Sequence, residues 1–225
     1  MNYLFDGVSL QNGRQSNMDS LLLKSRLIAG KNAMLAVVCD GVGSLAEGAF
    51  ASGTAVVMLG KWFDQLQAAE RIGLIMRDTI LGINSYIMME ANNNNYNTAS
   101  TLSAILLVEN DFYIVHIGDS RVYCYSGNGL SALTSDDVSQ SGKLTGYIGK
   151  RDDIFLQYLE GAADGKVFLV CSDGLYKLMD EGFMASKMEM RTKRSMKEAV
   201  KVLPQYVIER GELDNITFAI VQCQA

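Results

Sequence analysis

Apolar residues occur in this chain as short uninterrupted runs that are separated by polar, glycine-rich turns. A run of this length, bounded by turn residues, is typical of a strand that is buried on both faces. Three strands are predicted within residues 98–151, where turns at 109–111 and 126–129 indicate hairpins. Further strands are predicted at residues 3–10, 34–40, 153–159, 166–171 and 216–221, with a hairpin between 153–159 and 166–171 around 161–165.

Between residues 46 and 91 the apolar residues recur at intervals of three and four, which predicts helix. We expect two helices there, with a break near residues 70–73. The polar residues 92–95 that follow predict a loop. Another helix is predicted over residues 175–190.

The last predicted helix begins at Ser195, because Ser195 and Glu198 have the spacing of a capping box. Pro204 lies within this helix, and proline removes a helical hydrogen bond, so we expect a kink or break near Leu203. Strands dominate, and the helices come in blocks instead of alternating with the strands. The pattern therefore predicts an α+β fold with mostly antiparallel sheets, in a single domain spanning residues 1–225.

The composition excludes several classes of protein. A hydrophobic content of 48% with 20% charged residues is typical of a globular chain, and a formal charge of -5 argues against binding to nucleic acid. No apolar stretch reaches membrane-spanning length and no signal peptide opens the chain, so we expect no membrane partner and a cytoplasmic location. The four cysteines lie in apolar runs without a Cys-x-x-Cys pair, which predicts buried thiols and no zinc.

Four of the apolar runs have an aspartate at one end, beside Gly, Ser or Asn. These residues are Asp40, Asp119, Asp173 and Asp214. A lone carboxylate is costly to bury unless it is paired or bound to a cation, and oxygen ligands suit hard cations. The alternative is that each is an ordinary turn residue, because Asp-Gly and Asp-Asn are common in turns. Four such residues together favour a shared cation site.

Seven short segments carry a resemblance to a known family. They are Arg14-x-x-Asn17-x-Asp19, Asp40-Gly41-Val42-Gly43, Ser100-Thr101, Gly118-Asp119-Ser120-Arg121, Leu133-Thr134, Cys171-Ser172-Asp173-Gly174-Leu175 and Asp214-Asn215-Ile216-Thr217. In this order they resemble the motifs of the metal-dependent Ser/Thr protein phosphatases of type 2C (PPM-type), in their compact bacterial form. The resemblance covers nearly the whole chain. It implies a four-layer sandwich of two mostly antiparallel β-sheets flanked by helices.

The resemblance also implies a metal centre at one edge of the sheets. Asp40 would bridge two ions, and the carbonyl of Gly41 would bind the second of them. Asp173 and Asp214 would complete the first ion's ligands, and Asp119 with Asp173 would support a third, weaker ion. Mn²⁺ or Mg²⁺ is expected, because both take oxygen ligands.

The implied function is metal-dependent hydrolysis of phosphoserine and phosphothreonine in proteins. Two ions about 3.5–4 Å apart activate a water molecule for in-line attack on phosphorus. Arg14 would bind the substrate phosphate, because its planar guanidinium binds oxygens bidentately. Asp19 would act from the outer shell of the metal site. The expected partner is a phosphoprotein produced by a Ser/Thr kinase in a signalling system, and the enzyme is expected to be a monomer.

Several positions depart from the family's pattern. Met18 stands where the family has Glu, so one acidic contact to the second metal is missing. Ser44 and Asp137 replace a Gly and a His. The flap segment that follows Asp137 is much shorter than in the relatives. His116 lies in an apolar run and is expected in the core, not as a general acid.

Two other functions remain open. One is a pseudophosphatase, a regulatory or binding module in which Met18 has weakened the second metal site too far for turnover. The presence of Arg14 together with the four strand-end aspartates favours the enzyme. The other is an aspartyl-phosphate phosphotransferase built on Asp40. That chemistry requires a second Asp two residues away, where Val38 and Val42 stand, so it is the weaker hypothesis.

Overall fold

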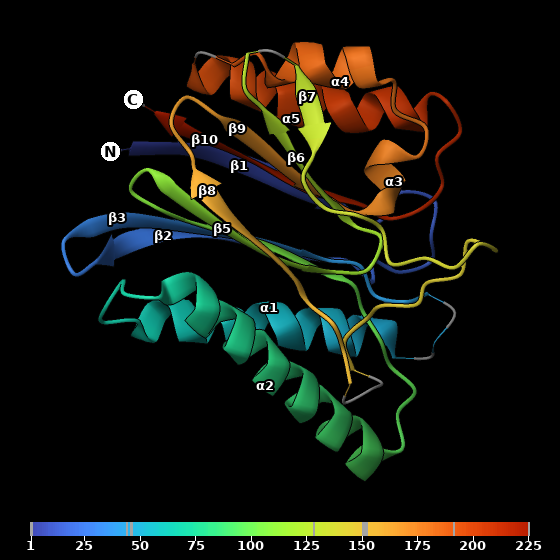
Figure 1. The fold of residues 1–225 in the computed structure, drawn as a ribbon. Helices are drawn as coiled ribbons and strands as arrows, with labels where there is room; N and C mark the ends of the chain where they lie inside the picture. Colours follow the sequence, from blue (N-terminus) through green and yellow to red (C-terminus); the bar gives the residue numbers. More distant parts are fainter. Residues whose placement is uncertain are drawn as a thin grey trace.

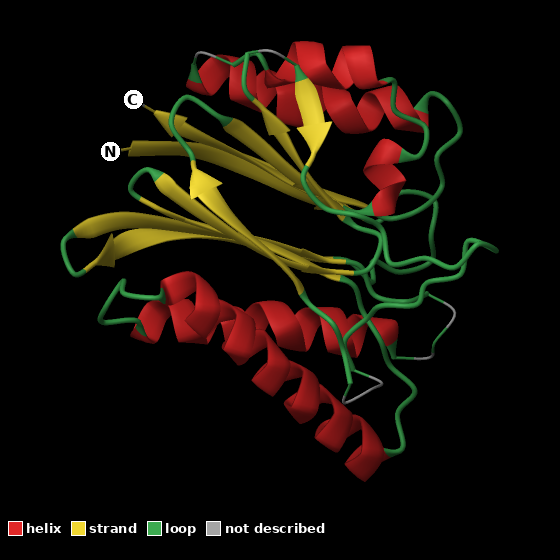
Figure 2. Cartoon of the chain, in the orientation of Figure 1, coloured by secondary structure: helices red, strands yellow, loops and turns green. Residues whose placement is uncertain are grey.

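The computed structural model describes residues 2–43, 45, 47–127, 129–149, 153–190 and 192–224. Ser44 and the predicted segment ends at residues 46 and 151 lie outside the described residues. Within this part of the chain, ten strands form two five-stranded sheets that pack face to face, with helices on the outer faces (Figure 1, Figure 2). Each pairing between described strands is antiparallel. The α+β sandwich expected from the sequence is confirmed.

The two sheets draw their strands from both halves of the chain. The first sheet has the order β1 (Asn2–Leu10), β10 (Ile216–Gln224), β9 (Val167–Cys171), β6 (Arg121–Tyr125) and β7 (Leu130–Ala132). The second has the order β2 (Ser20–Ile28), β3 (Lys31–Cys39), β4 (Leu102–Val108), β5 (Asp111–Ile117) and β8 (Gln157–Ala162). Because β1 pairs with β10 along its full length, the two ends of the chain lie side by side (Figure 1).

The helices form the two outer layers. They are α1 (Gly48–Gln65), α2 (Ile72–Asn94), α3 (Asp173–Tyr176), α4 (Glu181–Met188) and α5 (Lys193–Ile208). In Figure 1, α1 and α2 cover the second sheet, and α4 and α5 cover the first. The short α3 follows β9 directly and stands at the end of the sandwich.

Strand β3 explains why an uninterrupted apolar run forms the middle of the fold. Leu35 and Val37 pack in the core cluster that includes α1 and α2, whereas Met34 and Val38 pack in the cluster between the sheets. Alternate side chains of a strand point to opposite faces, and both faces of this sheet are covered. Residues 33–39 are all buried, and each large side chain among them contributes about 1.5–3 kcal/mol by leaving water.

The apolar pattern predicted no strand over the residues of β2, and on this point the prediction is wrong. Lys24 and Arg26 interrupt its apolar run, which hides the strand in the sequence. β2 is an edge strand, so these side chains can reach the end of α1. Lys24 forms an ion pair with Asp64, and Arg26 donates a 3.0 Å hydrogen bond to the carbonyl of Phe63.

The hairpin expected between residues 153–159 and 166–171 is also wrong. β8 pairs with β5 in the second sheet, whereas β9 pairs with β10 and β6 in the first. The glycine-containing connection therefore carries the chain from one sheet to the other. A turn signal between two apolar runs does not state whether the runs pair with each other.

The two predicted helices over residues 46–91 are confirmed, but their boundaries shift. The break lies at residues 66–71, and α2 continues to Asn94, so the loop expected at 92–95 is wrong. Asn95 ends the helix in the left-handed conformation, with φ 56°. Asparagine tolerates this conformation better than most residues, which makes it a suitable helix terminator.

The C-terminal helices differ from prediction in detail. The single helix expected over residues 175–190 is interrupted, because α3 ends at Tyr176 and α4 begins at Glu181. The capping box of α5 joins Thr192 and Ser195, one turn earlier than the predicted pair. Pro204 lies inside α5, which continues past it to Ile208.

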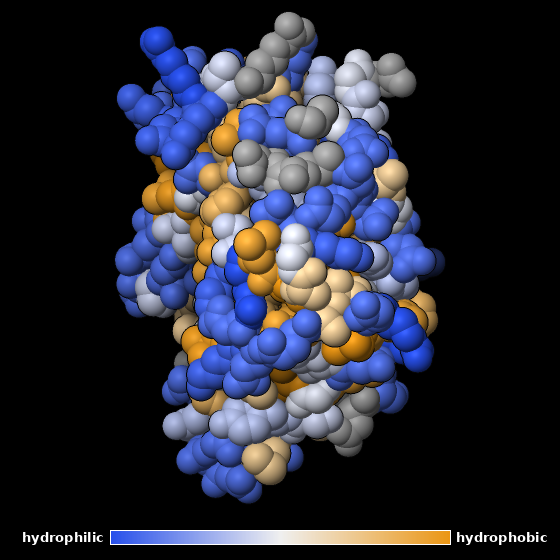
Figure 3. All heavy atoms as spheres, turned by 90° about the vertical axis from the view of Figure 1, so that its left-hand side faces the viewer, coloured by the Kyte–Doolittle hydropathy of each residue, from blue (hydrophilic) through white to orange (hydrophobic). Residues whose placement is uncertain are grey.

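The chain termini and the loops that hold the sequence motifs lie at opposite ends of the sandwich (Figure 1). Figure 3 shows the end that carries the chain termini, where hydrophilic residues cover much of the surface and apolar residues show between them. Among the described residues, no helix combines the length and the apolar character that crossing a membrane requires.

His116 lies fully buried in β5, as expected for a core residue. Its Nε2 is 3.2 Å from the carbonyl oxygen of Gly118, and its Nδ1 is 2.8 Å from Oγ of Ser103. A carbonyl only accepts, so Nε2 carries the proton and Nδ1 accepts from the serine hydroxyl. Burial lowers the pKa of the imidazole below its ordinary value.

This burial predicts acid sensitivity. Below about pH 6.5 the unfolded chain protonates His116 while the folded protein resists, so stability is lost as the pH falls, by at most about 1.4 kcal/mol per pH unit. Urea unfolding of wild type and His116→Gln between pH 7.5 and 5 measures this. The wild-type free energy of unfolding should fall more steeply than that of the variant. Parallel curves would show that His116 does not titrate on unfolding.

Candidate active site

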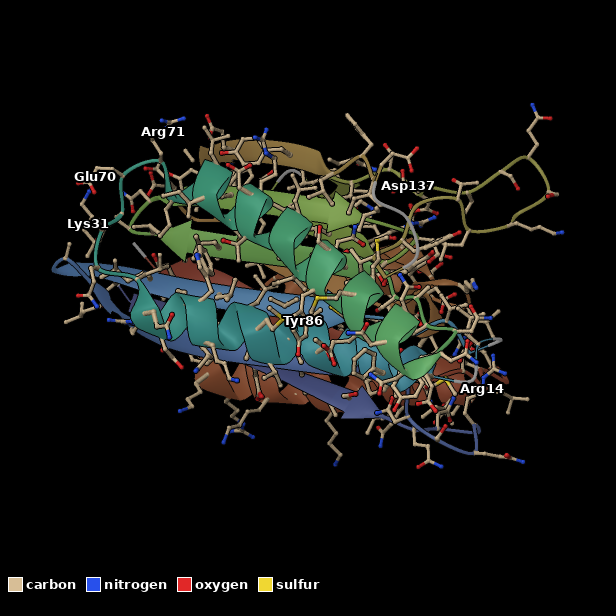
Figure 4. All side chains as sticks on the ribbon, turned by 90° about the horizontal axis from the view of Figure 1, so that it is seen from below. Arg14, Lys31, Glu70, Arg71, Tyr86 and Asp137 are labelled. Carbon is tan, nitrogen blue, oxygen red and sulfur yellow. The ribbon has the colours of Figure 1, made fainter. Side chains whose placement is uncertain are left out.

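A pocket of about 410 Å³ opens at the end of the sandwich where loops from both sheets meet. Its lining includes Arg14, Met18, Asp40, Gly41, Asp119, Leu144, Asp173 and Asp214. Figure 4 shows Arg14 and Asp137 at this end of the molecule, and Lys31, Glu70 and Arg71 at the other. The segments that carry the sequence motifs are therefore gathered around one cavity.

Asp40 follows β3 directly, and residues before β4 hold its main chain. Its N–H donates to Oγ1 of Thr101 over 2.9 Å, and its carbonyl accepts from the N–H of Thr101 over 2.9 Å and from Oγ of Ser100 over 3.0 Å. The hydroxyl of Thr101 lies 2.8 Å from that of Ser120, in the turn between β5 and β6. These bonds fix the position from which the Asp40 carboxylate enters the pocket.

Gly41 is required by close contact between backbones. A Cβ at this position would lie 2.6 Å from the carbonyl oxygen of Gly48 and 2.6 Å from that of Met18. The N–H of Gly41 donates to the carbonyl of Met18 over 3.2 Å. Only glycine lets the start of α1 and the loop after β1 approach this closely.

Asp119 sits in a tight turn between β5 and β6. Gly118 has φ 115°, and a Cβ there would lie 2.6 Å from Cβ of Thr101. Asp137 accepts a 2.8 Å hydrogen bond from the N–H of Gly118, and the hydroxyl of Tyr176 donates to the carbonyl of Asp119 over 2.7 Å. Asp137 thus anchors the turn that carries Asp119.

Arg121 is the last residue of the motif 118–121 and the first residue of β6, directly after this turn. It forms a bidentate pair with Asp136, with two 2.8 Å bonds, and its guanidinium lies 3.8 Å from the centre of the Tyr176 ring. The pair joins the start of β6 to the segment that follows β7. Arg121 therefore has a supporting position and does not line the pocket.

Asp173 begins α3, directly after β9. Its carboxylate is nearly enclosed: one oxygen, Oδ1, is buried and has no hydrogen-bond partner among the described residues. The other oxygen forms an ion pair with Lys177, one helical turn later. The preceding Ser172 donates to Oδ2 of Asp19 over 2.9 Å, which links β9 to the loop after β1.

Asp214 precedes β10 and pairs with Arg14 through two hydrogen bonds, of 2.8 Å from Nε and 2.6 Å from the terminal nitrogen. This pair lowers the pKa of the Asp214 carboxyl below its ordinary value. Asn215 holds the Arg14 loop in place, because its amide donates to the carbonyls of Gln11 and Ser16, over 2.8 and 3.0 Å.

Burial and neighbouring carboxylates raise the pKa of three acids at the pocket, Asp40, Asp119 and Asp19. Burial raises the pKa of Asp40 well above its ordinary value, and the charges of Asp19, Asp173, Asp119 and Asp214 raise it further. Burial, with help from Asp173, raises the pKa of Asp119 to about 6. Burial also raises the pKa of Asp19 to about 6, against the hydrogen bonds that it accepts. A cation in the pocket would relieve this crowding.

Five of the six candidate ligand residues line the pocket. Asp40, Gly41, Asp119, Asp173 and Asp214 all line it, whereas Asp19 is buried beside it. Among the described residues, no three His, Cys, Asp or Glu side chains lie close enough to hold one ion. Two of the carboxylates form ion pairs with side chains of the protein: Asp214 with Arg14, and Asp173 with Lys177.

Two residues that shape this arrangement received no role from the sequence. Lys177 could have been found, because it stands four residues after Asp173 in a predicted helix, the spacing of a helical ion pair. Asn215 belongs to a motif segment, but its sequence neighbours do not indicate that its side chain ties down residues 11–18.

Met18 and the segment after Asp137 both border the pocket. The Met18 sulfur lies 3.9 Å from the position that a Cβ on Gly43 would take, so this side chain faces the glycine-rich loop after β3. Residues 138 and 144 form a single β-bridge, and this short segment contributes Leu144 to the lining.

Comparison with known proteins finds relatives that match most of the chain. The family model described as protein phosphatase 2C matches residues 7–208. The chain is 30% identical over 216 residues to the serine/threonine phosphatase stp of Listeria welshimeri, and the match covers 85% of both chains.

Solved structures share the fold. The serine/threonine phosphatase Stp1 of Staphylococcus aureus superimposes with a TM-score of 0.86 at 20% identity, covering 99% of this chain and 95% of that one. The catalytic domain of the serine/threonine protein phosphatase PstP, solved in complex with two manganese ions, gives a TM-score of 0.82 at 24% identity, covering 98% and 97%.

The crowding of carboxylates predicts that the pocket costs stability in the absence of metal. Asp40→Asn removes a buried negative charge, so in EDTA at pH 7 the variant should unfold at a higher temperature than wild type. A gain of about 1 kcal/mol would raise the Tm of a chain of this length by roughly 2–4 °C. The gain should shrink as the pH falls and vanish below about pH 3, where the Asp40 carboxyl is protonated in both the folded and the unfolded state.

The matched control is Asp78→Asn, which removes an exposed carboxylate on α2. It should leave Tm nearly unchanged. An Asp40→Asn variant that melts at or below the wild-type temperature would show that Asp40 is not strained by its neighbours.

Proposed function

This chain belongs to the protein phosphatase 2C family, and we propose that it hydrolyses phosphoserine and phosphothreonine in proteins with the help of divalent cations. The observation that carries the proposal is the pocket itself, in which Asp40, Asp119, Asp173 and Asp214 surround a cavity with Arg14 at its side. A phosphoester is an anion, and an acidic pocket binds anions only when cations offset its charge.

The donors in the pocket fit a hard cation. Within the described part of the chain, one buried oxygen of Asp173 has no hydrogen-bond partner, which is costly unless an ion or a water molecule binds it. The donor set consists of carboxylates and a backbone carbonyl, with neither sulfur nor imidazole, which suits Mn²⁺ or Mg²⁺. Burial and the neighbouring carboxylates raise the pKa of Asp40, and a bound cation would lower it again.

We assign the ligands as follows. Asp40 is proposed to hold both ions, Gly41 the second through its carbonyl, and Asp173 with Asp214 the first. Asp119 is proposed to support a third, weaker ion together with Asp173. When bound, such ions lower the pKa of water and offset the negative charge of the phosphoester, which is what hydrolysis by water requires.

Arg14 is proposed to bind the phosphate. In the absence of substrate it is held by Asp214 over 2.6 and 2.8 Å, and it remains largely exposed. A planar guanidinium that can bind one carboxylate bidentately can bind two phosphate oxygens in the same way. Asp214 is then released to bind a cation. Asp19, hydrogen-bonded by Ser172, is proposed to act from the outer shell of the site.

The substrates proposed are phosphoproteins made by a Ser/Thr kinase. The short flap leaves the pocket open to solvent, so small phosphoesters and phosphopeptides should enter with little discrimination. The pseudophosphatase alternative is not favoured, because relatives such as the 30% identical Listeria protein are named as phosphatases. The replacement at Met18 is proposed to weaken the second ion without abolishing turnover.

Two substitutions test the roles of Asp40 and Arg14. Turnover of p-nitrophenyl phosphate and of a phosphothreonine peptide should require Mn²⁺ or Mg²⁺ and disappear in EDTA. Asp40→Asn should abolish it, because the charge shared by both ions is lost. Arg14→Ala should mainly raise KM if its contact is equal in the ground and transition states. Near-normal turnover by Asp40→Asn would refute the two-ion assignment.

Met18→Glu tests the second ion. A thioether is a poor partner for these cations, so wild type should need a high metal concentration and should prefer Mn²⁺ over Mg²⁺. An added carboxylate should lower the half-saturating Mn²⁺ concentration, roughly tenfold if it reaches the ion. Met18→Gln, which adds a polar group without charge, is the control. Equal half-saturation in wild type and Met18→Glu would mean that residue 18 does not face the ion.

A further inference from the structure

Lys177 is a cation beside the pocket for which the proposed function has no role. It stands one turn after Asp173, and its ammonium group forms an ion pair with Oδ2 of that carboxylate. The other oxygen, Oδ1, is buried and has no partner among the described residues. Lys177 is therefore the cation that balances Asp173 in the protein without bound metal.

The same situation recurs at Asp214, which Arg14 neutralises. The two acids proposed for the first ion are thus each held by a positive side chain of the same protein. Arg14 has an alternative partner in the substrate phosphate. Lys177 has no alternative partner in the proposed mechanism, so its pairing with Asp173 would affect only the binding of the divalent cation.

We infer, building on the proposed function, that Lys177 competes with the divalent cation for Asp173 and has to leave this carboxylate when the ion binds. An ammonium group on Oδ2 and a divalent cation on Oδ1 of the same carboxylate would repel each other at close range. Without metal, the lysine lessens the repulsion between Asp173 and its acidic neighbours. The cost is weaker metal binding, because the ion has to displace a partner that is already present.

The geometry allows the exchange. The Lys177 side chain is 54% exposed, whereas that of Asp173 is 12% exposed. A lysine ammonium is a strongly hydrated charge on a flexible stem, so it can turn into water while the carboxylate stays in place. Its backbone, fixed by the N–H of Lys177 donating to the carbonyl of Asp173 over 3.1 Å, does not have to move.

The test compares Mn²⁺ binding to wild type, Lys177→Met and Lys24→Met by isothermal titration calorimetry. Lys177→Met keeps the length of the side chain and removes its charge. Lys24 forms a similar pair with Asp64, between β2 and α1, and its loss controls for a missing Lys–Asp pair. The dissociation constant for Mn²⁺ should fall about two- to fivefold in Lys177→Met, the range for a partly exposed pair, and stay unchanged in Lys24→Met.

A second measurement uses only the wild-type protein, so it stands even if a variant fails to fold. An amine-acylating reagent is applied with and without Mn²⁺, and the modified lysines are quantified by mass spectrometry. Modification of Lys177 should increase when Mn²⁺ is present, because the ammonium is released. Modification of Lys24 should not change.

The outcomes separate this inference from the function on which it rests. If wild type binds Mn²⁺, but Lys177→Met binds it equally or more weakly and Mn²⁺ does not increase acylation, the competition is refuted and the proposed function stands. If wild type binds no Mn²⁺ at all, the metal-dependent function is refuted and the inference with it.

Discussion

Repulsion between carboxylates is the constraint on which this end of the molecule depends. Like charges about 4 Å apart near a protein surface oppose each other by about 4 kcal/mol, so a chain gathers them only where something offsets the cost. Here the offset is divided. Arg14 and Lys177 neutralise two of the acids, a hydrogen bond from Ser172 supports Asp19, and the remaining cost shows in the raised pKa values of Asp40 and Asp119. The crowding is what makes the pocket attractive to a cation.

Such crowding persists only on a rigid frame. The acids stand at the ends of strands whose two faces are buried, so the strands cannot shift to let the charges separate. Close backbone contacts strengthen the frame: Gly41 lies against Gly48 and Gly118 lies against Thr101. Asn215 then ties the loop of Arg14 to the start of β10. Burial of the core thus offsets the free energy of folding that repulsion among the carboxylates costs at the pocket.

The sequence predicted the layers of this fold better than it predicted which strands pair within each sheet. Buried strands such as β3 stand out, because seven consecutive buried residues leave no polar interruption. The edge strand β2 was missed, because Lys24 and Arg26 break its pattern while bonding to α1. The β8–β9 connection was taken for a hairpin, since periodicity shows that a segment is a strand and not which strand it joins. Helix α2 continues through the exposed asparagines at residues 92–94, so a polar run by itself did not mark the end of the helix.

At the pocket, the same limit applies to charges. The sequence motifs indicated which acids would meet, because each ends a strand or begins one, and the structure gathers them around one cavity. They did not indicate which cations the acids hold, because that depends on competition. Arg14 can pair with Asp214 or with a phosphate, and Lys177 can pair with Asp173 or with water. In the proposed function a divalent ion would take both acids, so the ion pairs and the proposed metal site would be two alternative states of the same residues.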